Sequence, residues 1–178
     1  MENGAIYSSY INEYVLVGME KKNFMEVTEK IVRFSKGWVK LQNINLNDKR
    51  QIFYLIACFI TENINGDICT SDYLASKVVV VTGTEEYRFS YSGHQGQIGF
   101  RPCGICTDVQ GHIVVCNGYE DFSHQCSSVH LLDMDGQFLS FLHTTGCPPF
   151  PSALCINHHQ ILIVSLASPT VKVYLHCK

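Results

Sequence analysis

The stretch HIVVCNGYEDFSHQCSSVHLLDMDGQFLSFLH, residues 112–143, decides the fold. It holds three short segments whose β-branched or alternating apolar residues predict strands, at 112–117, 128–133 and 137–143. An Asp135-Gly136 turn joins the last two segments. Asp-Gly between two such runs is a strong hairpin signal, because the mirror-image turn needs positive φ at both central positions. A fourth run, Cys103–Val109, precedes them, so the region predicts a small sheet of four antiparallel strands.

The same pattern recurs along the chain. Residues 66–72 (GDICTSD) match residues 111–117 (GHIVVCN) at an offset of 45 positions. Residues 78–81 match residues 129–132 at an offset of 51, and weaker matches occur at 14–41 and 154–174. A period of about 40–50 residues with four strands per unit predicts a β-propeller.

We therefore predict an all-β fold, a partial β-propeller of about four blades that forms a single domain over residues 1–178. The predicted blades span 14–46, 53–91, 102–143 and 151–178. We expect the first blade to lack its opening strand, with residues 1–13 outside the sheets, and the last blade to stop after its third strand.

A helix is the alternative between residues 20 and 37. Phe24, Val27, Ile31 and Phe34 fall on one face of a helix at this spacing. The register match to the later blades and the β-branched run that begins at Ile31 favour strands instead.

Composition narrows the function classes. The 178 residues are 46% hydrophobic and 16% charged, which suits packed sheets rather than a disordered or coiled segment. No apolar run reaches the ~20 residues that cross a bilayer, and the first residues do not resemble a secretory signal. The nine cysteines, an odd number, are then most simply reduced thiols in a cytoplasmic protein.

Charge is unevenly distributed along the chain. Residues 1–52 carry eight Lys/Arg and six Asp/Glu, whereas residues 53–178 carry five and ten, a balance of −5. Nucleic-acid binding usually needs a basic stripe that neutralises phosphates, and the best-defined blades have none.

Two sets of motifs carry a resemblance to a known family. Pro102-x-Gly104-Ile105, Asp108-x-x-Gly111-x-Ile113-x-Val115 and Val129-x-Leu131-x-Asp133-x-x-Gly136 resemble NHL repeats. The phrase TENINGDICTSD (61–72), with RFSY (88–91) and DMDGQFL (133–139), is similar to the C-terminal NHL propeller of invertebrate tripartite-motif (TRIM) proteins. The resemblance is specific over about residues 59–143 and weaker over 14–58 and 144–178.

The resemblance implies a portion of a six-bladed NHL propeller. Proteins of this family carry a RING domain with ubiquitin E3 ligase activity, B-boxes and a coiled coil, and their propeller selects partners that are proteins or single-stranded RNA. This sequence holds none of the zinc-binding or coiled-coil parts, so the resemblance implies a non-catalytic portion that recruits a partner. Departures from the repeat are Asn117 and Ser165 in place of Asp, Thr84-Glu85 in place of Asp-Gly, and the missing blades.

Several residue groups suggest chemistry, but each has a simpler structural explanation. Cys103-x-x-Cys106 has the spacing of half a zinc knuckle, which Cys126 with His130 or His124 could complete. In an inner strand, however, Cys103 and Cys106 are expected on opposite faces of the sheet as small apolar fillers. We therefore expect no metal.

The acidic residues also have a structural explanation, and the sequence lacks the usual catalytic motifs. The carboxylates at strand ends are expected to accept backbone N–H groups in turns. They are Asp67, Asp72, Asp108, Asp121, Asp133 and Asp135. The sequence has no Gly-rich phosphate loop and no Gly-x-Ser-x-Gly elbow, so we expect neither catalysis nor a cofactor.

A binding surface remains as the candidate functional site. The loops between second and third strands lie on one face of a propeller, and here they span 20–29, 73–77, 118–127 and 166–170. Exposed aromatic residues on these loops can anchor a protein or stack on bases. The predicted binding residues are Tyr73, Lys77, Arg101, Tyr119, Phe122 and His124, with Phe24 on the first loop.

The functional hypotheses follow from this surface. The first is a protein-interaction propeller that recruits partners for a ligase of the TRIM type. The alternatives are a single-stranded RNA-binding propeller, which the acidic balance of residues 53–178 disfavours, and a truncated product without independent function. Self-association through open sheet edges is a further expectation.

Overall fold

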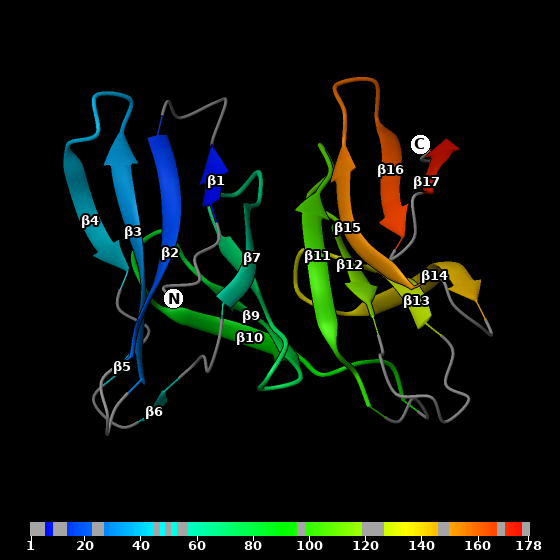
Figure 1. Ribbon diagram of the computed structural model, residues 1–178, viewed down its shortest axis with the longest axis horizontal. Coiled ribbons are helices and arrows are strands. Elements are labelled where there is room, and N and C mark those ends of the chain that lie inside the picture. The colour runs from blue at the N-terminus through cyan, green and yellow to red at the C-terminus, as the bar shows by residue number, and fades with distance from the viewer. Residues whose placement is uncertain are drawn as a thin grey trace.

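The computed structural model describes most of the chain. The described residues are 6–8, 14–22, 27–44, 47–48, 51–52, 57–95, 99–118, 127–145, 150–166 and 170–175. They form seventeen strands and no helix, so no membrane-spanning helix occurs among them (Figure 1).

The strands form four antiparallel sheets in chain order, which we call blades 1 to 4. Blade 1 contains β1 (Ile6–Ser8), β2 (Tyr14–Lys22), β3 (Val27–Ser35) and β4 (Lys40–Ile44). Blade 2 contains β7 (Ala57–Glu62), β8 (Ile68–Asp72), β9 (Lys77–Val81) and β10 (Tyr87–Tyr91). Blade 3 contains β11 (Pro102–Thr107), β12 (Ile113–Asn117), β13 (Ser127–Leu132) and β14 (Phe138–Thr145). Blade 4 contains β15 (Pro151–Ile156), β16 (Ile161–Leu166) and β17 (Val171–Leu175).

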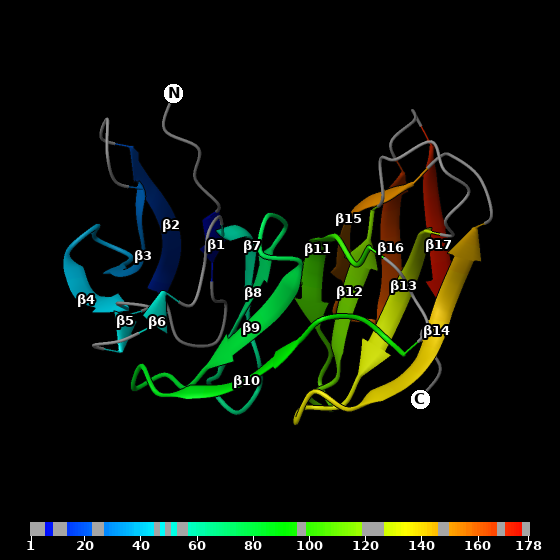
Figure 2. The same ribbon diagram turned by 90° about the horizontal axis from the view of Figure 1, so that it is seen from below.

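Figure 2 shows the four blades side by side in chain order. A short hairpin of β5 (Asn47–Asp48) and β6 (Gln51–Ile52) lies between blades 1 and 2 in the sequence. The predicted all-β partial propeller of about four blades is therefore confirmed.

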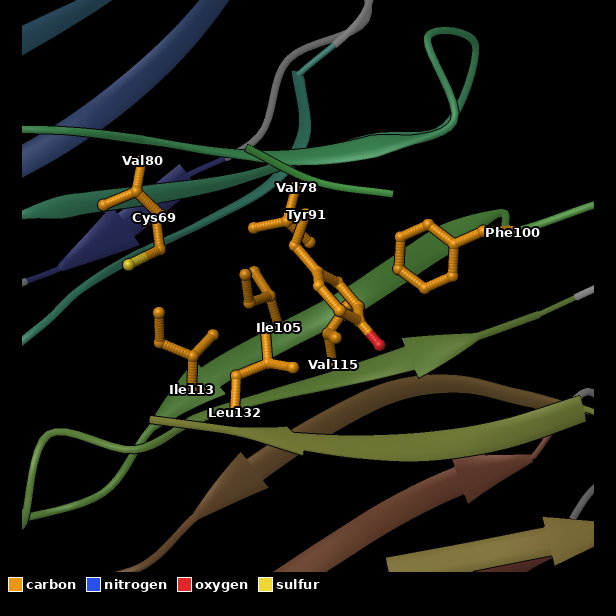
Figure 3. Packing of buried hydrophobic residues seen from close by; sticks show 9 residues of the cluster. All are labelled: Cys69, Val78, Val80, Tyr91, Phe100, Ile105, Ile113, Val115 and Leu132. Carbon is orange, nitrogen blue, oxygen red and sulfur yellow. The ribbon is translucent and has the colours of Figure 1, made fainter. Parts of the chain in front are cut away.

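The core lies between consecutive blades rather than inside one sheet. Each blade is apolar on both faces because alternate residues of its middle strands point to opposite neighbours. On β9, Val79 and Val81 pack toward blade 1, whereas Val78 and Val80 pack toward blade 3. The cluster between blades 2 and 3 is drawn in Figure 3 and consists of Cys69, Val78, Val80, Tyr91, Phe100, Ile105, Ile113, Val115 and Leu132.

The first blade differs from the prediction. Ile6–Ser8 form β1, which pairs antiparallel with β2, so the blade has an opening strand and the expectation that it lacks one is wrong. β1 pairs with Val15–Val17 and so covers part of the otherwise unpaired edge of β2. A segment this short has too few residues to show strand periodicity in the sequence.

The helix alternative for residues 20–37 is also resolved. Val27–Ser35 form β3, and its pairing with β2 extends to Lys22 opposite Val27. The loop expected at 20–29 is therefore shorter than predicted, because both strands continue past Glu20 and Glu29.

Side chains at the hairpin ends tie each blade to the next. Arg88 on β10 bonds Asp67 of its own blade, and its Nη2 lies 2.6 Å from Asp135 Oδ1 in the β13–β14 turn of blade 3. Asn63 Nδ2 donates to the Gly111 carbonyl at 2.9 Å. At Gly136, φ is +83° and an added Cβ would lie 2.3 Å from the ring of Phe89, so this turn packs directly on blade 2.

Candidate functional site

The candidate site lies where the loops of blades 2 and 3 meet. We call it the loop face and define it by the described residues Tyr73, Leu74, Lys77 and Arg101. Tyr73 and Leu74 lie in the turn between β8 and β9, and Arg101 lies just before β11. Sequence reasoning placed three of these four on one surface.

Arg101 and Tyr73 are brought together from different blades. The Arg101 Nη1 donates to the Tyr73 carbonyl at 3.1 Å, and its guanidinium carbon lies 5.3 Å from the centre of the Tyr73 ring. A guanidinium at this range over an aromatic face gains cation–π attraction. The pair is therefore held in position without a ligand.

The backbone around Arg101 is fixed as well. Its N–H donates to Asn117 Oδ1 at 2.8 Å, and the Gly118 N–H donates to its carbonyl at 3.1 Å. Asn117 ends β12, so Arg101 is anchored to the strand from which the next loop of this face departs. Asn117 was noted in the sequence only as a departure from the repeat, and its positioning role was missed.

Asp72 shapes the neighbouring turn. Its buried Oδ1 accepts the Ala75 N–H at 2.8 Å, and the next strand begins at Lys77, directly opposite Asp72. Leu74 projects from this turn with 51% of its surface exposed. Sequence reasoning missed Leu74 because it searched the loops for aromatic residues, although its apolar type at a turn tip was visible.

The remaining predicted binding residues, Tyr119, Phe122 and His124, lie outside the described residues, as does Phe24. Gly118, the last described residue before the first three, lies beside Arg101. The prediction that these aromatic residues share the loop face remains a prediction.

Three of the six acidic residues act as turn caps, as predicted: Asp72, described above, Asp108 and Asp133. Asp108 Oδ1 accepts the N–H groups of Gln110 and His112 at 2.9 and 2.8 Å. Asp133 Oδ1 accepts those of Asp135 and Gln137 at 3.0 and 2.8 Å.

The other three are not shown as turn caps. Asp67 and Asp135 both pair with Arg88. Asp121 lies outside the described residues.

The cysteine prediction needs a correction. The register of β11 shifts between Pro102 and Ile105, which marks a β-bulge. Because a bulge adds one residue to the strand, it reverses the alternation of side chains. Cys103 and Cys106 therefore both pack on the cluster between blades 3 and 4, and the prediction that they face opposite sides is wrong.

Among the described residues, no group of three or more His, Cys, Asp or Glu side chains is placed to hold a metal ion. Two of the proposed zinc ligands, Cys126 and His124, lie outside the described residues, so the expectation of no zinc remains a prediction. A third, His130, already has hydrogen-bond partners at both ring nitrogens.

His130 is a buried polar group that sequence reasoning considered only as a possible zinc ligand. Its Nδ1 lies 2.7 Å from the Tyr91 hydroxyl and its Nε2 lies 2.7 Å from the Ser128 hydroxyl. Burial, helped by nearby His94, lowers the pKa of His130 to about 4. With 0% of its surface exposed, His130 is a neutral packing residue and not a catalytic base.

The sequence matches no family model and no curated protein. Among solved structures, it is similar to a chain of a nidogen–laminin complex, with TM-score 0.73 and 16% identity over 96% of this chain and 59% of that one. It is also similar to a streptogramin B lyase, with TM-score 0.63 and 15% identity over 98% of this chain and 57% of that one. A gluconolactonase from Xanthomonas campestris matches with TM-score 0.63 and 12% identity over 94% of this chain and 55% of that one.

At these identities the likeness shows the fold alone. The chain spans a little more than half of each of these structures, which include both an assembly of two proteins and enzymes. Together with the four sheets described above, the comparison shows that this chain has the architecture of part of a β-propeller.

Proposed function

We propose that this chain is a protein-interaction module, the partner-recruiting propeller portion of a TRIM-NHL-type protein, and that it is itself non-catalytic. The observation that carries the proposal is the pre-positioned pair of Tyr73 and Arg101 on the loop face. The NHL-like motifs support the family assignment, and the propeller fold is compatible with it.

A fixed aromatic–arginine pair suits a protein partner. Tyr and Arg are enriched among residues that dominate interface energies, and truncating such an anchor costs on the order of 2 kcal/mol. Because Tyr73 and Arg101 already hold each other, less side-chain entropy is lost when a partner binds. Exposed Leu74 beside them adds apolar area, so the expected partner presents an apolar side chain next to an acidic or carbonyl group.

The same pair could stack on a base, which keeps single-stranded RNA as the alternative. The acidic balance of residues 53–178 opposes it, since phosphates would meet net negative charge. We also propose a cytoplasmic location, supported by the free thiols of the described cysteines Cys69, Cys103, Cys106, Cys116 and Cys155.

The test is a set of pull-downs from cell lysate, with and without nuclease. We compare the native chain with Tyr73→Ala, Arg101→Ala and a Tyr119→Ala, Phe122→Ala double variant. Tyr87→Ala is the matched control, because Tyr87 is an exposed tyrosine on the outer strand β10.

Protein partners that survive nuclease and are lost in the loop-face variants, but not in the control, support the proposal. Partners lost on nuclease treatment would favour RNA. An unchanged partner set in every variant would reject this face as the binding site.

A further inference from the structure

Two thiols face each other across the first two strands of blade 3. The bulge in β11 sets Cys103 and Gly104 together against Cys116 on β12, because pairing resumes only at Ile105 opposite Val115. Both cysteines pack on the cluster between blades 3 and 4. At Gly104 an added Cβ would lie 2.6 Å from the Ala153 Cα, so the absent side chain lets β15 approach the bulge.

The Cys103 sulfur has a defined set of contacts. Its thiol lies within hydrogen-bonding reach of the Pro151 carbonyl at 3.2 Å and of the Cys116 carbonyl at 3.5 Å. The two side chains also lie close enough that each thiol shifts the pKa of the other. Cys103 is only partly buried, whereas Cys116 is completely buried.

The two thiols differ in acidity. Interaction with the Cys116 side chain, together with backbone hydrogen bonds, lowers the pKa of Cys103 despite its burial. Burial raises the pKa of Cys116, and its interaction with Cys103 raises that pKa further. Cys103 is therefore the nucleophile of the pair and Cys116 the proton donor, an arrangement found in thiols that react with oxidants.

We propose that Cys103 and Cys116 form a reversible thiol–disulfide site whose oxidant is a hydroperoxide. At the bulge Cys103 and Gly104 together oppose Cys116, and the Cys103 sulfur lies 3.5 Å from the Cys116 carbonyl oxygen. The two residues are therefore neighbours across the strands, as a disulfide with Cα atoms about 4.4–6.8 Å apart requires. A peroxide is small enough to reach a partly buried sulfur.

The reaction balances in two steps. The Cys103 thiolate attacks one peroxide oxygen, the O–O bond breaks, and the products are Cys103 sulfenic acid and hydroxide, which takes up a proton. The Cys116 sulfur then attacks the Cys103 sulfur and its proton leaves with the sulfenic oxygen as water. Two thiols lose two electrons in total, and one hydrogen peroxide becomes two waters.

Oxidation would also change the joint between blades. A disulfide leaves Cys103 without the S–H that bonds the Pro151 carbonyl at the start of β15. Gly118, where the loop after β12 begins, also packs against the Cys103 sulfur, because an added Cβ at Gly118 would lie 3.0 Å from that sulfur. The site therefore connects oxidation state to the position of blade 4.

Other described cysteines provide the comparison. Cys69 is fully buried, and burial raises its pKa. Cys106 lies two residues beyond Gly104 on the same strand, and burial raises its pKa as well. Their cross-strand partners are not cysteines: Cys69 lies opposite Thr61 and Val80, and Cys106 lies opposite Val114.

The experiment treats the full chain with hydrogen peroxide, blocks remaining thiols with an alkylating reagent, and maps the peptides by mass spectrometry. We expect a Cys103–Cys116 disulfide that dithiothreitol reverses, formed ~10-fold or more faster than any oxidation of Cys69 or Cys106. In Cys116→Ser the sulfenic acid should persist at Cys103 and be trapped by dimedone, whereas in Cys103→Ser Cys116 should remain reduced.

Absence of the 103–116 linkage at peroxide concentrations that oxidise exposed Cys155 would overturn the proposal. So would linkage of Cys103 to a different cysteine in the folded chain. Peptide mapping of the unmutated chain decides both outcomes, so the conclusion does not depend on whether the serine variants fold.

Discussion

The buried imidazole of His130 gives a measurable pH dependence of stability. In the folded chain its two ring nitrogens meet the hydroxyls of Tyr91 and Ser128, each at 2.7 Å, and no surface is exposed. Burial and His94 lower the pKa from 6.5 to about 4. Adding a proton therefore costs more in the folded chain than in the unfolded one.

The sign and size follow from linkage. Between pH 6.5 and about 4 the unfolded chain binds a proton at this histidine and the folded chain does not. Stability is therefore complete above pH 6.5 and is lost as the pH falls toward 4. At ~1.36 kcal/mol per pKa unit, the full loss is about 3 kcal/mol, of which about 2 kcal/mol is already lost at pH 5.

The assay is urea unfolding of the native chain and of His130→Gln from pH 7.5 to 4.5. Carboxylates titrate in both proteins, so the difference between the two curves isolates His130. We expect the variant to be less stable at pH 7.5, where Tyr91 and Ser128 lose an ideal partner, and the difference to shrink by about 2 kcal/mol near pH 5. His159→Gln, in an exposed turn, controls for removal of a histidine. Parallel curves for native chain and His130→Gln would refute the reasoning.

Two further predictions concern packing and self-association. Gly136→Ala should lower the free energy of unfolding by roughly 2–4 kcal/mol in urea titrations, because the new methyl group meets the Phe89 ring and φ is positive. Gly66→Ala is the matched control: it has the same φ of +83° but nothing within 4 Å, so it should cost only about 1 kcal/mol, and equal losses would contradict the packing argument. The chain should self-associate in size-exclusion chromatography with light scattering, since β17 exposes Val171 and Val173 at 61% and 64%. Val171→Lys, Val173→Lys should shift it toward monomer, and a native chain that is already monomeric at high concentration would contradict the expectation.

The internal repeat explains why so much of the fold could be predicted. The strands expected at 112–117, 128–133 and 137–143 appear as Ile113–Asn117, Ser127–Leu132 and Phe138–Thr145, each displaced by two residues or fewer. The pattern of apolar residues along a strand that packs on both faces is a local property of the sequence. The Asp135-Gly136 pair likewise marks the hairpin between β13 and β14 locally. Both signals lie within one blade, although the turn is not the mirror-image type expected, because Gly136 has positive φ and Asp135 does not.

Features that depend on a neighbouring blade were missed. The bulge in β11 lies beside β15, which approaches Gly104 so closely that a side chain there would collide with Ala153. The burial of His130 likewise requires Tyr91 from blade 2. Nothing in the local pattern distinguishes a histidine facing a neighbouring sheet from one facing solvent. On the loop face, the sequence identified Tyr73 and Arg101 as candidates but could not show that they touch.

The two ends of the blades have different physical roles. At the hairpin end, polar ties to the next blade recur: Thr107 Oγ1 donates to the Glu62 carbonyl at 2.9 Å, and Asn63 and Arg88 reach across to the turns of blade 3. These contacts, with the apolar clusters beneath them, fix how one blade stacks on another. At the opposite end, the contact between Arg101 and Tyr73 ties a connecting segment to a turn, and does not join two hairpins. Because stacking is already secured at the hairpin end, we expect changes at exposed loop-face positions such as Leu74 to affect the fold little. That freedom is why we place partner recognition on the loop face.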